Sequence, residues 1–343
     1  MNPSFFSQRI KKQKDYSSKQ GRPAVLLAVL DRLLAALGRR GSRALAVTVP
    51  LAIATPPLGR ALQPWLTEAV FCLLILSFLR LDVPRLRAHL RRPRLLLAAT
   101  VWTALGVPLL LAAAAHAAGL PERAPELNLG LMLQALASPL MAGPSLAALM
   151  GLDATLVLVT LVLGTLALPL AAAVLAPLLL GSALSAGSLA GPTLLFRLVI
   201  LLGGSFLAAL ALRRIIGLPR LARHNAAVDG VSILALAVFV FAVMGPVAAA
   251  ARAAPLVFAG LTALAFATFA ALFLLTTWLF RRAGHAEALS LGVMASQRNM
   301  GLMVAAVGGI LPPTAWLYFA LCQFPIYLSP LLLRPFVRRR NRD

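Results

Sequence analysis

The sequence has few of the residues that carry enzyme chemistry or metal binding. Its 343 residues include 10 Asp and Glu, 4 His and 2 Cys. Cys72 and Cys322 both lie inside apolar runs, which argues against a disulfide framework or a cysteine-based metal site. The four histidines fall in loops or at the ends of apolar runs, without the spacing of metal ligands. No nucleophile, metal or paired-carboxylate constellation is present, so neither an enzyme nor a bound metal or cofactor is predicted.

Charged residues are scarce as a class. They make up 12% of the chain, whereas a soluble globular domain has about 25%. Hydrophobic residues make up 60%, the mean hydropathy is +0.89, and apolar runs recur that are long enough to cross a hydrocarbon layer about 30 Å thick. These runs are continuous and do not alternate, which excludes a porin-like barrel. The sequence predicts an all-α polytopic membrane protein embedded in a lipid bilayer.

The apolar runs predict ten membrane-spanning helices behind an N-terminal segment. Residues 1–22 are basic and polar and predict a disordered cytoplasmic tail, and a second basic tail covers 335–343. The segment 23–42 predicts an interfacial amphipathic helix, because its apolar run is too short to span and carries Asp31 and Arg32. The ten spans lie at approximately 43–60, 64–80, 94–118, 128–150, 152–182, 189–213, 226–250, 255–281, 286–310 and 312–334.

The net charge of +22 follows the predicted spans and does not indicate a nucleic-acid partner. Of the 32 Lys and Arg, 27 lie in the tails and in alternate connections, and 3 lie in the opposite connections. Cytoplasmic loops carry such an excess, so both termini are predicted to be cytoplasmic with an even number of spans. The Ala, Leu and Arg content, with four Lys, is compatible with a bacterial inner membrane protein.

Ten spans with both termini on one side divide into two repeats of five, 43–182 and 189–334, and the second must be inverted relative to the first. Three weak internal similarities support this division. Glu68 and Asp229 take corresponding places in spans 2 and 7, and ASPLMAG in span 4 corresponds to ASQRNMG in span 9. Proline pairs recur in spans 5 and 10.

Spans 4 and 9 are interrupted by residues that open helices. In span 4 these are Ser138, Pro139, Gly143, Pro144 and Ser145, and in span 9 they are Ser296, Gln297, Arg298, Asn299 and Gly301. Freed backbone at bilayer depth is tolerated only when it is buried in protein or lines a cavity. We therefore expect two broken helices that cross near the midplane of a core domain, where half-helix N-termini offer partial positive charge to an anion.

Arg298 is the central candidate residue, because a charge in the middle of a span costs at least about 2.5 kcal/mol. It is predicted to contact an organic anion or to supply a fixed positive charge in a transport cavity. The alternative is an arginine satisfied internally by Glu68, Asp229 or free carbonyls. The neighbouring Gln297 and Asn299 suit either a polar ligand or the freed backbone, and Ser296, Ser138 and Ser145 complete the predicted substrate site. Glu68 and Asp229 are either solvated helix ends or sites for coupling ions. Arg197 lies near an end of span 6, where its side chain can snorkel to the membrane surface, so a structural role is favoured over a functional one.

Several segments together resemble the bile acid:sodium symporter superfamily. Residues 71–110 resemble its spans 2–3, DGVSILALAVFVFAVM (229–244) its span 7, and ALSLGVMASQRNMGL (288–302) its span 9. ASPLMAGPSLAALMGLDATLVLVTLVLGTLALPL (137–170) is similar to its spans 4–5. The resemblance covers about 60–334. It implies inverted five-helix repeats, a panel and a core domain, and transport of organic anions with sodium.

The chain departs from that family at its sodium ligands. The resemblance places Met294 where the family has a sodium-binding Glu, Arg298 where it has Gln, and Asn299 at its Asn; the span 5 hydroxyl ligands fall near Val157 and Leu161. A hard cation would lack the oxygen shell that it needs. The sequence thus predicts an alternating-access transporter of a small organic anion, monomeric or homodimeric, whose coupling ion is open and whose dependence on sodium is doubtful. A scaffold or sensor that keeps a transporter fold, and an auxin-efflux-type carrier, are the alternatives.

Overall fold

The computed structural model describes residues 31–37, 41–79, 92–180, 191–308 and 311–338. Within them the protein is all-α, without strands, and seven helical stretches are long and apolar enough to cross a membrane. These stretches are Pro56–Leu79, Pro93–Ala117, Ala154–Leu180, Gly191–Ile216, Asn225–Ala253, Pro255–Leu279 and Pro313–Leu333. The prediction of a multi-pass helical membrane protein is therefore confirmed.

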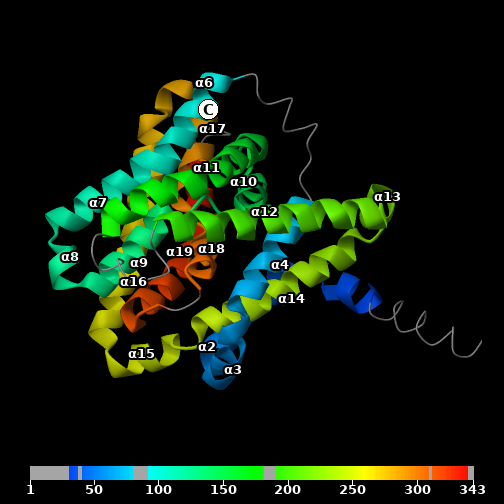
Figure 1. Cartoon of the computed structure of the whole chain (residues 1–343), viewed down its shortest axis with the longest axis horizontal. Helices are drawn as coiled ribbons and strands as arrows, with labels where there is room; N and C mark the ends of the chain where they lie inside the picture. The colour runs from blue at the N-terminus through cyan, green and yellow to red at the C-terminus, as the bar shows by residue number, and fades with distance from the viewer. Residues whose placement is uncertain (1–30, 38–40, 80–91, 181–190, 309–310, 339–343) are drawn as a thin grey trace, which may run out of the picture.

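The helices fall into two groups by their contacts. The first group contains α2 (Gly41–Ala54), α3 (Pro56–Leu62), η1 (Gln63–Trp65), α4 (Leu66–Leu79), α12 (Gly191–Ile216), α13 (Leu218–Arg223) and α14 (Asn225–Met244). Here α4 packs on α12 and α14, and α14 also packs on α2 and α3. Figure 1 shows α4, α13 and α14 on one side of the molecule.

The second group surrounds two short, broken helix pairs. It contains α6 (Pro93–Val101), η2 (Trp102–Gly106), α7 (Val107–Ala117), α8 (Leu120–Arg123), α9 (Pro125–Leu136), α10 (Gly143–Met150), α11 (Ala154–Leu180), α15 (Val247–Ala253), α16 (Pro255–Leu279), η4 (Arg281–Ala283), α17 (His285–Ser296), α18 (Met300–Ala306) and α19 (Pro313–Arg338). Here α9 packs on α7, α11 and α19, and α16 packs on α17 and α19. The long α11 also packs on α12 and so joins the two groups.

The predicted boundary between the first two spans is wrong. Helix α2 ends at Ala54, and Thr55 has a non-helical backbone (φ −121°, ψ 63°). Pro56 and Pro57 then begin α3, because a proline is tolerated in a first helical turn, where amide groups have no intrahelical acceptor. From Pro56 the helical chain runs on to Leu79 as one candidate span.

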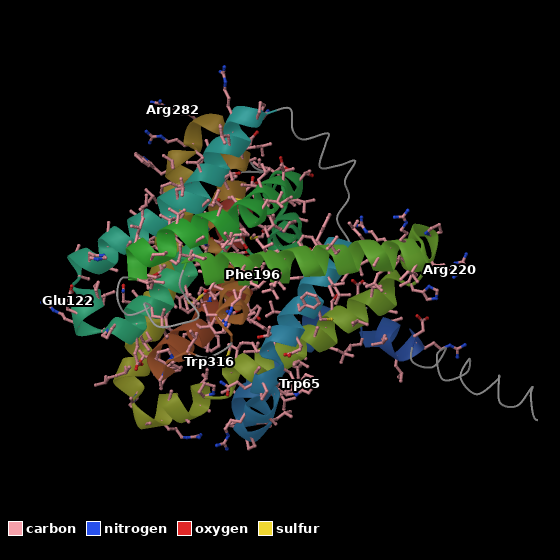
Figure 2. The ribbon with its side chains drawn as sticks, viewed as in Figure 1. Trp65, Glu122, Phe196, Arg220, Arg282 and Trp316 are labelled. Atoms are coloured by element: carbon pink, nitrogen blue, oxygen red, sulfur yellow. The ribbon has the colours of Figure 1, made fainter. Side chains whose placement is uncertain are left out.

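Two further predictions concern the ends of the chain. The C-terminal helix continues to Arg338, four residues into the basic tail predicted at 335–343, whose cytoplasmic location stays a prediction. Residues 31–37 of the predicted interfacial helix are helical, while 23–30 and the predicted tail 1–22 lie outside the described residues. Charged side chains gather at the extremities of the molecule, as Glu122, Arg220 and Arg282 show in Figure 2.

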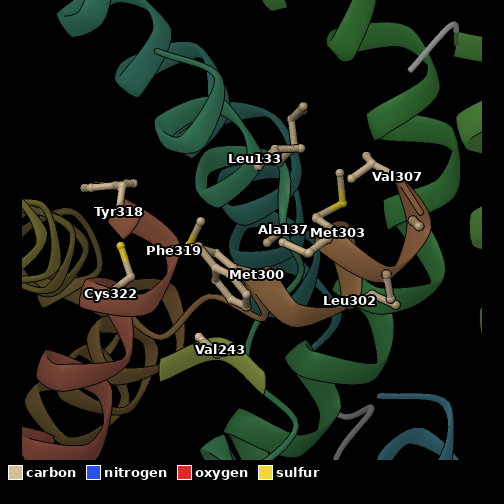
Figure 3. Close-up of a cluster of buried hydrophobic side chains, with 14 of the residues drawn as sticks. Leu133, Ala137, Val243, Met300, Leu302, Met303, Val307, Tyr318, Phe319 and Cys322 are labelled. Carbon is tan, nitrogen blue, oxygen red and sulfur yellow. The ribbon is translucent and has the colours of Figure 1, made fainter. Parts of the chain in front are cut away.

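The largest apolar core lies around α18. Figure 3 shows Met300, Leu302 and Met303 of α18 among side chains from α9, α14 and α19. All three are at most 1% exposed. A seven-residue helix cannot bury such side chains by itself, so its position is fixed by the helices that surround it.

Candidate functional site

The breaks in the two interrupted helices pair with each other. One break lies between Leu136, where α9 ends, and Gly143, where α10 begins; the other separates Ser296 from Met300. The amide of Leu140 donates to the Gln297 carbonyl at 2.8 Å, and the amide of Asn299 donates to the Ser138 carbonyl at 2.8 Å. The two segments thus form an antiparallel bridge centred on Pro139 and Arg298. Backbone groups freed by one break are satisfied by the other.

The predicted helix-breaking residues lie at these segments. Pro139 is in the first break, where its missing N–H and its ring prevent a helix from continuing. Gly143 and Pro144 begin α10, and the amide of Gly143 closes a turn on the Leu140 carbonyl at 2.8 Å. Gly301, the second residue of α18, allows close packing: a Cβ there would lie 2.7 Å from Cε2 of Phe239. Each break therefore has a proline, which lacks an N–H, or a glycine, which lacks a side chain, within it or beside it.

The guanidinium of Arg298 is buried among backbone carbonyls. The residue is 2% exposed, and its Nη2 donates to the carbonyls of Ala135 at 2.6 Å and Thr103 at 3.0 Å. Its Nε donates to the Gln134 carbonyl at 3.4 Å, and its Nη1 has no hydrogen-bond partner. Gln134 and Ala135 are among the last residues of α9, so the cation lies at the negative end of that helix dipole.

The Thr103 carbonyl is available because the helix around it is irregular. Residues Trp102–Gly106 form a π-helical turn, in which the amide of Val107 donates to the Trp102 carbonyl. In a regular α-helix that amide would donate to Thr103. The next residue, Pro108, has no N–H to offer. Thr103 therefore has neither the α-helical nor the π-helical donor, and Arg298 takes their place.

Side-chain hydrogen bonds hold the segments on either side of Arg298. The Gln134 Oε1 accepts a 2.7 Å hydrogen bond from the Tyr318 hydroxyl, which ties α9 to α19. Gln297 is fully buried, and its Nε2 donates to the Ser329 Oγ at 2.8 Å. Gln134 also offers its backbone carbonyl to Arg298, and Gln297 directly precedes Arg298 in the chain. Their side-chain hydrogen bonds therefore hold the two breaks against α19.

The other predicted substrate residues have different positions. Asn299 is the N-cap of α18, and its side chain accepts from the Leu302 amide at 3.3 Å. The Ser296 hydroxyl donates to its own helix at the Val293 carbonyl. Ser138 is 3% exposed and its hydroxyl has no partner, whereas Ser145 is exposed on α10. The geometry therefore gathers Ser138, Ser296, Gln297 and Asn299 at the crossing and leaves Ser145 on the surface.

A small cavity adjoins Ser138. It is lined by residues of the first break, of η2 and of α11, including Thr103, Ser138, Pro139 and Gly164, and has space for about one water molecule. A solute of several carbon atoms does not fit into this cavity. The crossing is closed in this conformation.

The two predicted coupling residues do not contribute to the hydrogen bonds of Arg298. Glu68 is exposed on α4, and Asp229 is half-buried in the first turns of α14. The sequence suggested three internal partners for Arg298: Glu68, Asp229 and backbone carbonyls. The structure shows hydrogen bonds to backbone carbonyls. The roles predicted for Glu68 and Asp229 in ion coupling stay predictions.

Sequence reasoning missed several residues that shape this site. Gln134, Tyr318 and Ser329 are isolated polar residues in apolar runs, and that isolation was the signal available. The role of Pro108 could be inferred only with the π-helical turn in view. Asp153 was also missed: its Oδ1 caps α11 at the amides of Thr155 and Leu156. Its amide donates to Ser290 Oγ of α17 at 3.0 Å, which joins α11 to that helix.

Comparison with known proteins assigns no family to the chain: no family model matches it, and no curated protein matches it.

Proposed function

We propose that the protein is a secondary transporter that moves a small organic anion, bile-acid-like or otherwise carboxylated and amphipathic, by alternating access. The observation that carries this proposal is the pair of broken helices held together around one buried guanidinium. Secondary transporters place substrate sites at broken helices near the midplane, where inverted repeats meet. A scaffold helix has no need of buried breaks, which require compensating hydrogen bonds.

The helix lengths support two inverted five-helix repeats, 43–182 and 189–334. The first halves of the broken pairs, α9 and α17, both have 12 residues, and α10 and α18 have 8 and 7. Each pair is followed by a long helix, α11 with 27 residues or α19 with 26. The antiparallel bridge between the breaks suits repeats of opposite orientation. The broken pairs would then count as spans 4 and 9.

The tenth crossing would be supplied by the segment before Pro56. A Cβ on Gly230 would clash with the backbone of Leu34, and one on Gly59 would lie 2.7 Å from Cα of Gly245. The described residues on this segment, Leu34, α2 and Gly59, thus all contact α14, and Gly230 and Gly245 are separated by about 22 Å of helix axis. Ten crossings would place both termini in the cytoplasm of a bacterial inner membrane, in keeping with the distribution of Lys and Arg.

Arg298 is proposed to act as a permanently attached cation. Its carbonyl partners on α9 and η2 are the oxygen ligands that a hard metal ion would also accept. Met294, Val157 and Leu161 are buried and supply no oxygen from their side chains. On this proposal transport does not require sodium, and the charge of Arg298 favours an anion at the crossing. Proton coupling through Glu68 or Asp229 is compatible with it.

Uptake into proteoliposomes tests the proposal, with taurocholate and 1-naphthoate as probes. Wild-type protein should take up at least one probe at a rate that saturates. Arg298→Ala should lose uptake while the protein remains monodisperse and helical, and Arg298→Lys should retain part of it. Arg252→Ala is the matched control, because Arg252 is an exposed arginine at the end of α15. Equal uptake by Arg298→Ala and wild type would refute the role given to Arg298.

A scaffold or sensor is the second candidate, and the buried crossing favours it, since the cavity beside Ser138 has room for about one water. A sensor would bind a probe, seen as a rise in Tm, without uptake. An auxin-efflux-type carrier is a further alternative within transport, and a screen of indole carboxylates against bile-acid conjugates would separate the two. Analytical ultracentrifugation would decide between monomer and homodimer.

A further inference from the structure

Arg197 is a second charge that lies within an apolar helix. It is six residues after the first residue of α12, which places it about 9 Å along the helix axis. Its neighbours Phe196, Val199 and Ile200 are 65%, 50% and 54% exposed and form the lipid-facing side, whereas Arg197 is half-buried. Arg197 therefore lies at the border between the exposed apolar side and the packed side of α12, and its guanidinium reaches the packed side at the Ala306 carbonyl. An ionisable residue directed inward within a span indicates function by default.

Its contact crosses from the first helix group to the second. Nη1 of Arg197 donates to the carbonyl of Ala306, the last residue of α18, at 3.4 Å. This is a long hydrogen bond, beyond the usual 2.7–3.2 Å range. Gly308, with φ +89°, has no side chain, and a Cβ there would lie 3.4 Å from Nη1. The end of α18 thus leaves room for the guanidinium without binding it tightly.

The two intramembrane arginines differ in how firmly they are held. Arg298 makes three hydrogen bonds to backbone carbonyls and is 2% exposed, so its guanidinium is held in place by the protein itself. Arg197 is half-buried and makes one long hydrogen bond to a backbone carbonyl. A guanidinium has five N–H donors in a planar fork that fits a carboxylate or sulfonate. Arg197 can exchange its partner at low cost, and Arg298 cannot.

We infer that Arg197 is the residue that binds the anionic group of the transported solute, and that the Ala306 carbonyl takes its place when the site is closed. This inference rests on the proposed function and names its specificity-determining residue. Any movement of α18 relative to α12 breaks the Arg197–Ala306 hydrogen bond and leaves a charge at membrane depth in need of a partner. A carboxylate or sulfonate on the solute supplies that partner, with a charge-assisted and bidentate contact.

Calorimetric binding of a charged and an uncharged probe of the same shape tests this assignment. The probes are 1-naphthoate and its amide, 1-naphthamide, with taurocholate as a bulkier anion. Arg197→Gln should raise the Kd for the anions by about 10-fold or more and change the Kd for the amide by less than about 2-fold, because only the charged contact is lost. Arg197→Lys should fall between Gln and wild type, since it keeps the charge without the fork.

Arg214→Gln is the matched control, because Arg214 is an exposed arginine near the other end of α12. It should bind every probe as wild type does. If wild type binds and transports an anion and Arg197→Gln binds it equally well, the assignment of Arg197 is overturned while the transport proposal stands. A wild-type protein that binds no anionic probe would contradict both. A loss of affinity for anion and amide alike would show a merely structural role for Arg197.

Discussion

Arg298 donates a 3.0 Å hydrogen bond to the carbonyl of Thr103, a residue 195 positions away along the chain. That carbonyl lacks an intrahelical donor because of the π-helical turn and of Pro108, which has no N–H. The break between α17 and α18 and the π-helical turn η2 therefore satisfy each other's hydrogen-bonding groups. The guanidinium satisfies a carbonyl that η2 cannot satisfy, and η2 supplies an acceptor to a charge at membrane depth.

Replacing Pro108 should reveal this dependence. Removing a proline from a helix usually stabilises it, by up to about 3 kcal/mol in a helix interior. Pro108→Ala should instead give no increase in Tm, because a regular turn would capture the Thr103 carbonyl and leave Arg298 with one partner fewer. Pro169→Ala is the control: Pro169 lies inside α11, and its removal should stabilise. A clear rise in Tm for Pro108→Ala would contradict this account.

Truncating Arg298 should lower the stability of the fold, although the variant stays folded under the conditions of the uptake assay. Arg298→Ala leaves the Thr103, Gln134 and Ala135 carbonyls without their charged donor, for which we expect a loss of about 1–3 kcal/mol. SDS-induced unfolding in mixed micelles measures this loss. Millimolar methylguanidinium should restore part of the lost stability of Arg298→Ala by entering the vacated space, and should not stabilise wild type. A variant that is as stable as wild type would show that these hydrogen bonds contribute little.

Gly301 should tolerate no side chain. A Cβ at this position would lie 2.7 Å from the Phe239 ring, so Gly301→Ala should destabilise by about 1–3 kcal/mol. The double variant with Phe239→Leu should recover part of the loss, which a double-mutant cycle would quantify. Gly260→Ala is the control, since no atom lies within 4 Å of its Cβ position, and alanine is the better helix former. Destabilisation that Phe239→Leu leaves unchanged would exclude the ring as its cause.

Glu126 should make stability depend on acidic pH. Hydrogen bonds from the side chain and amide of Thr314, the amide at 3.0 Å, lower the pKa of the Glu126 carboxyl below its ordinary value of 4.5. Because the folded-state pKa is depressed, the stabilisation is fully present above pH 4.5 and is lost as the pH falls through the folded-state pKa. The Tm difference between wild type and Glu126→Gln should shrink in that range. A difference that grows on acidification would contradict the assignment.

The sequence predicted the break segments better than the contacts within them. A broken helix could be predicted from Pro139, Gly143 and Pro144, because the effect of proline and glycine on a helix is local and does not depend on the rest of the fold. The partners of Arg298 could not be predicted, because they are backbone carbonyls, which every residue carries. Thr103 became an acceptor only through a π-helical turn that apolar periodicity does not reveal.

The ends of the first spans were misjudged for a similar reason. Two adjacent prolines, Pro56 and Pro57, were placed inside a span, whereas they begin a new helix and so mark its first turn. Arg197 illustrates the opposite limit: its place in an apolar helix was visible, but its direction was not. Hydropathy locates a charge along a helix axis, and the helix packing decides whether that charge faces lipid or protein.

Sodium dependence of taurocholate and 1-naphthoate uptake, measured with proteoliposomes of wild-type protein, tests most directly whether Arg298 stands in for a coupling ion. We predict the same initial rate with an inward sodium gradient and with sodium replaced by N-methylglucamine on both sides. Uptake that occurs only with the sodium gradient would contradict the account, because the site would then require an ion in addition to the guanidinium.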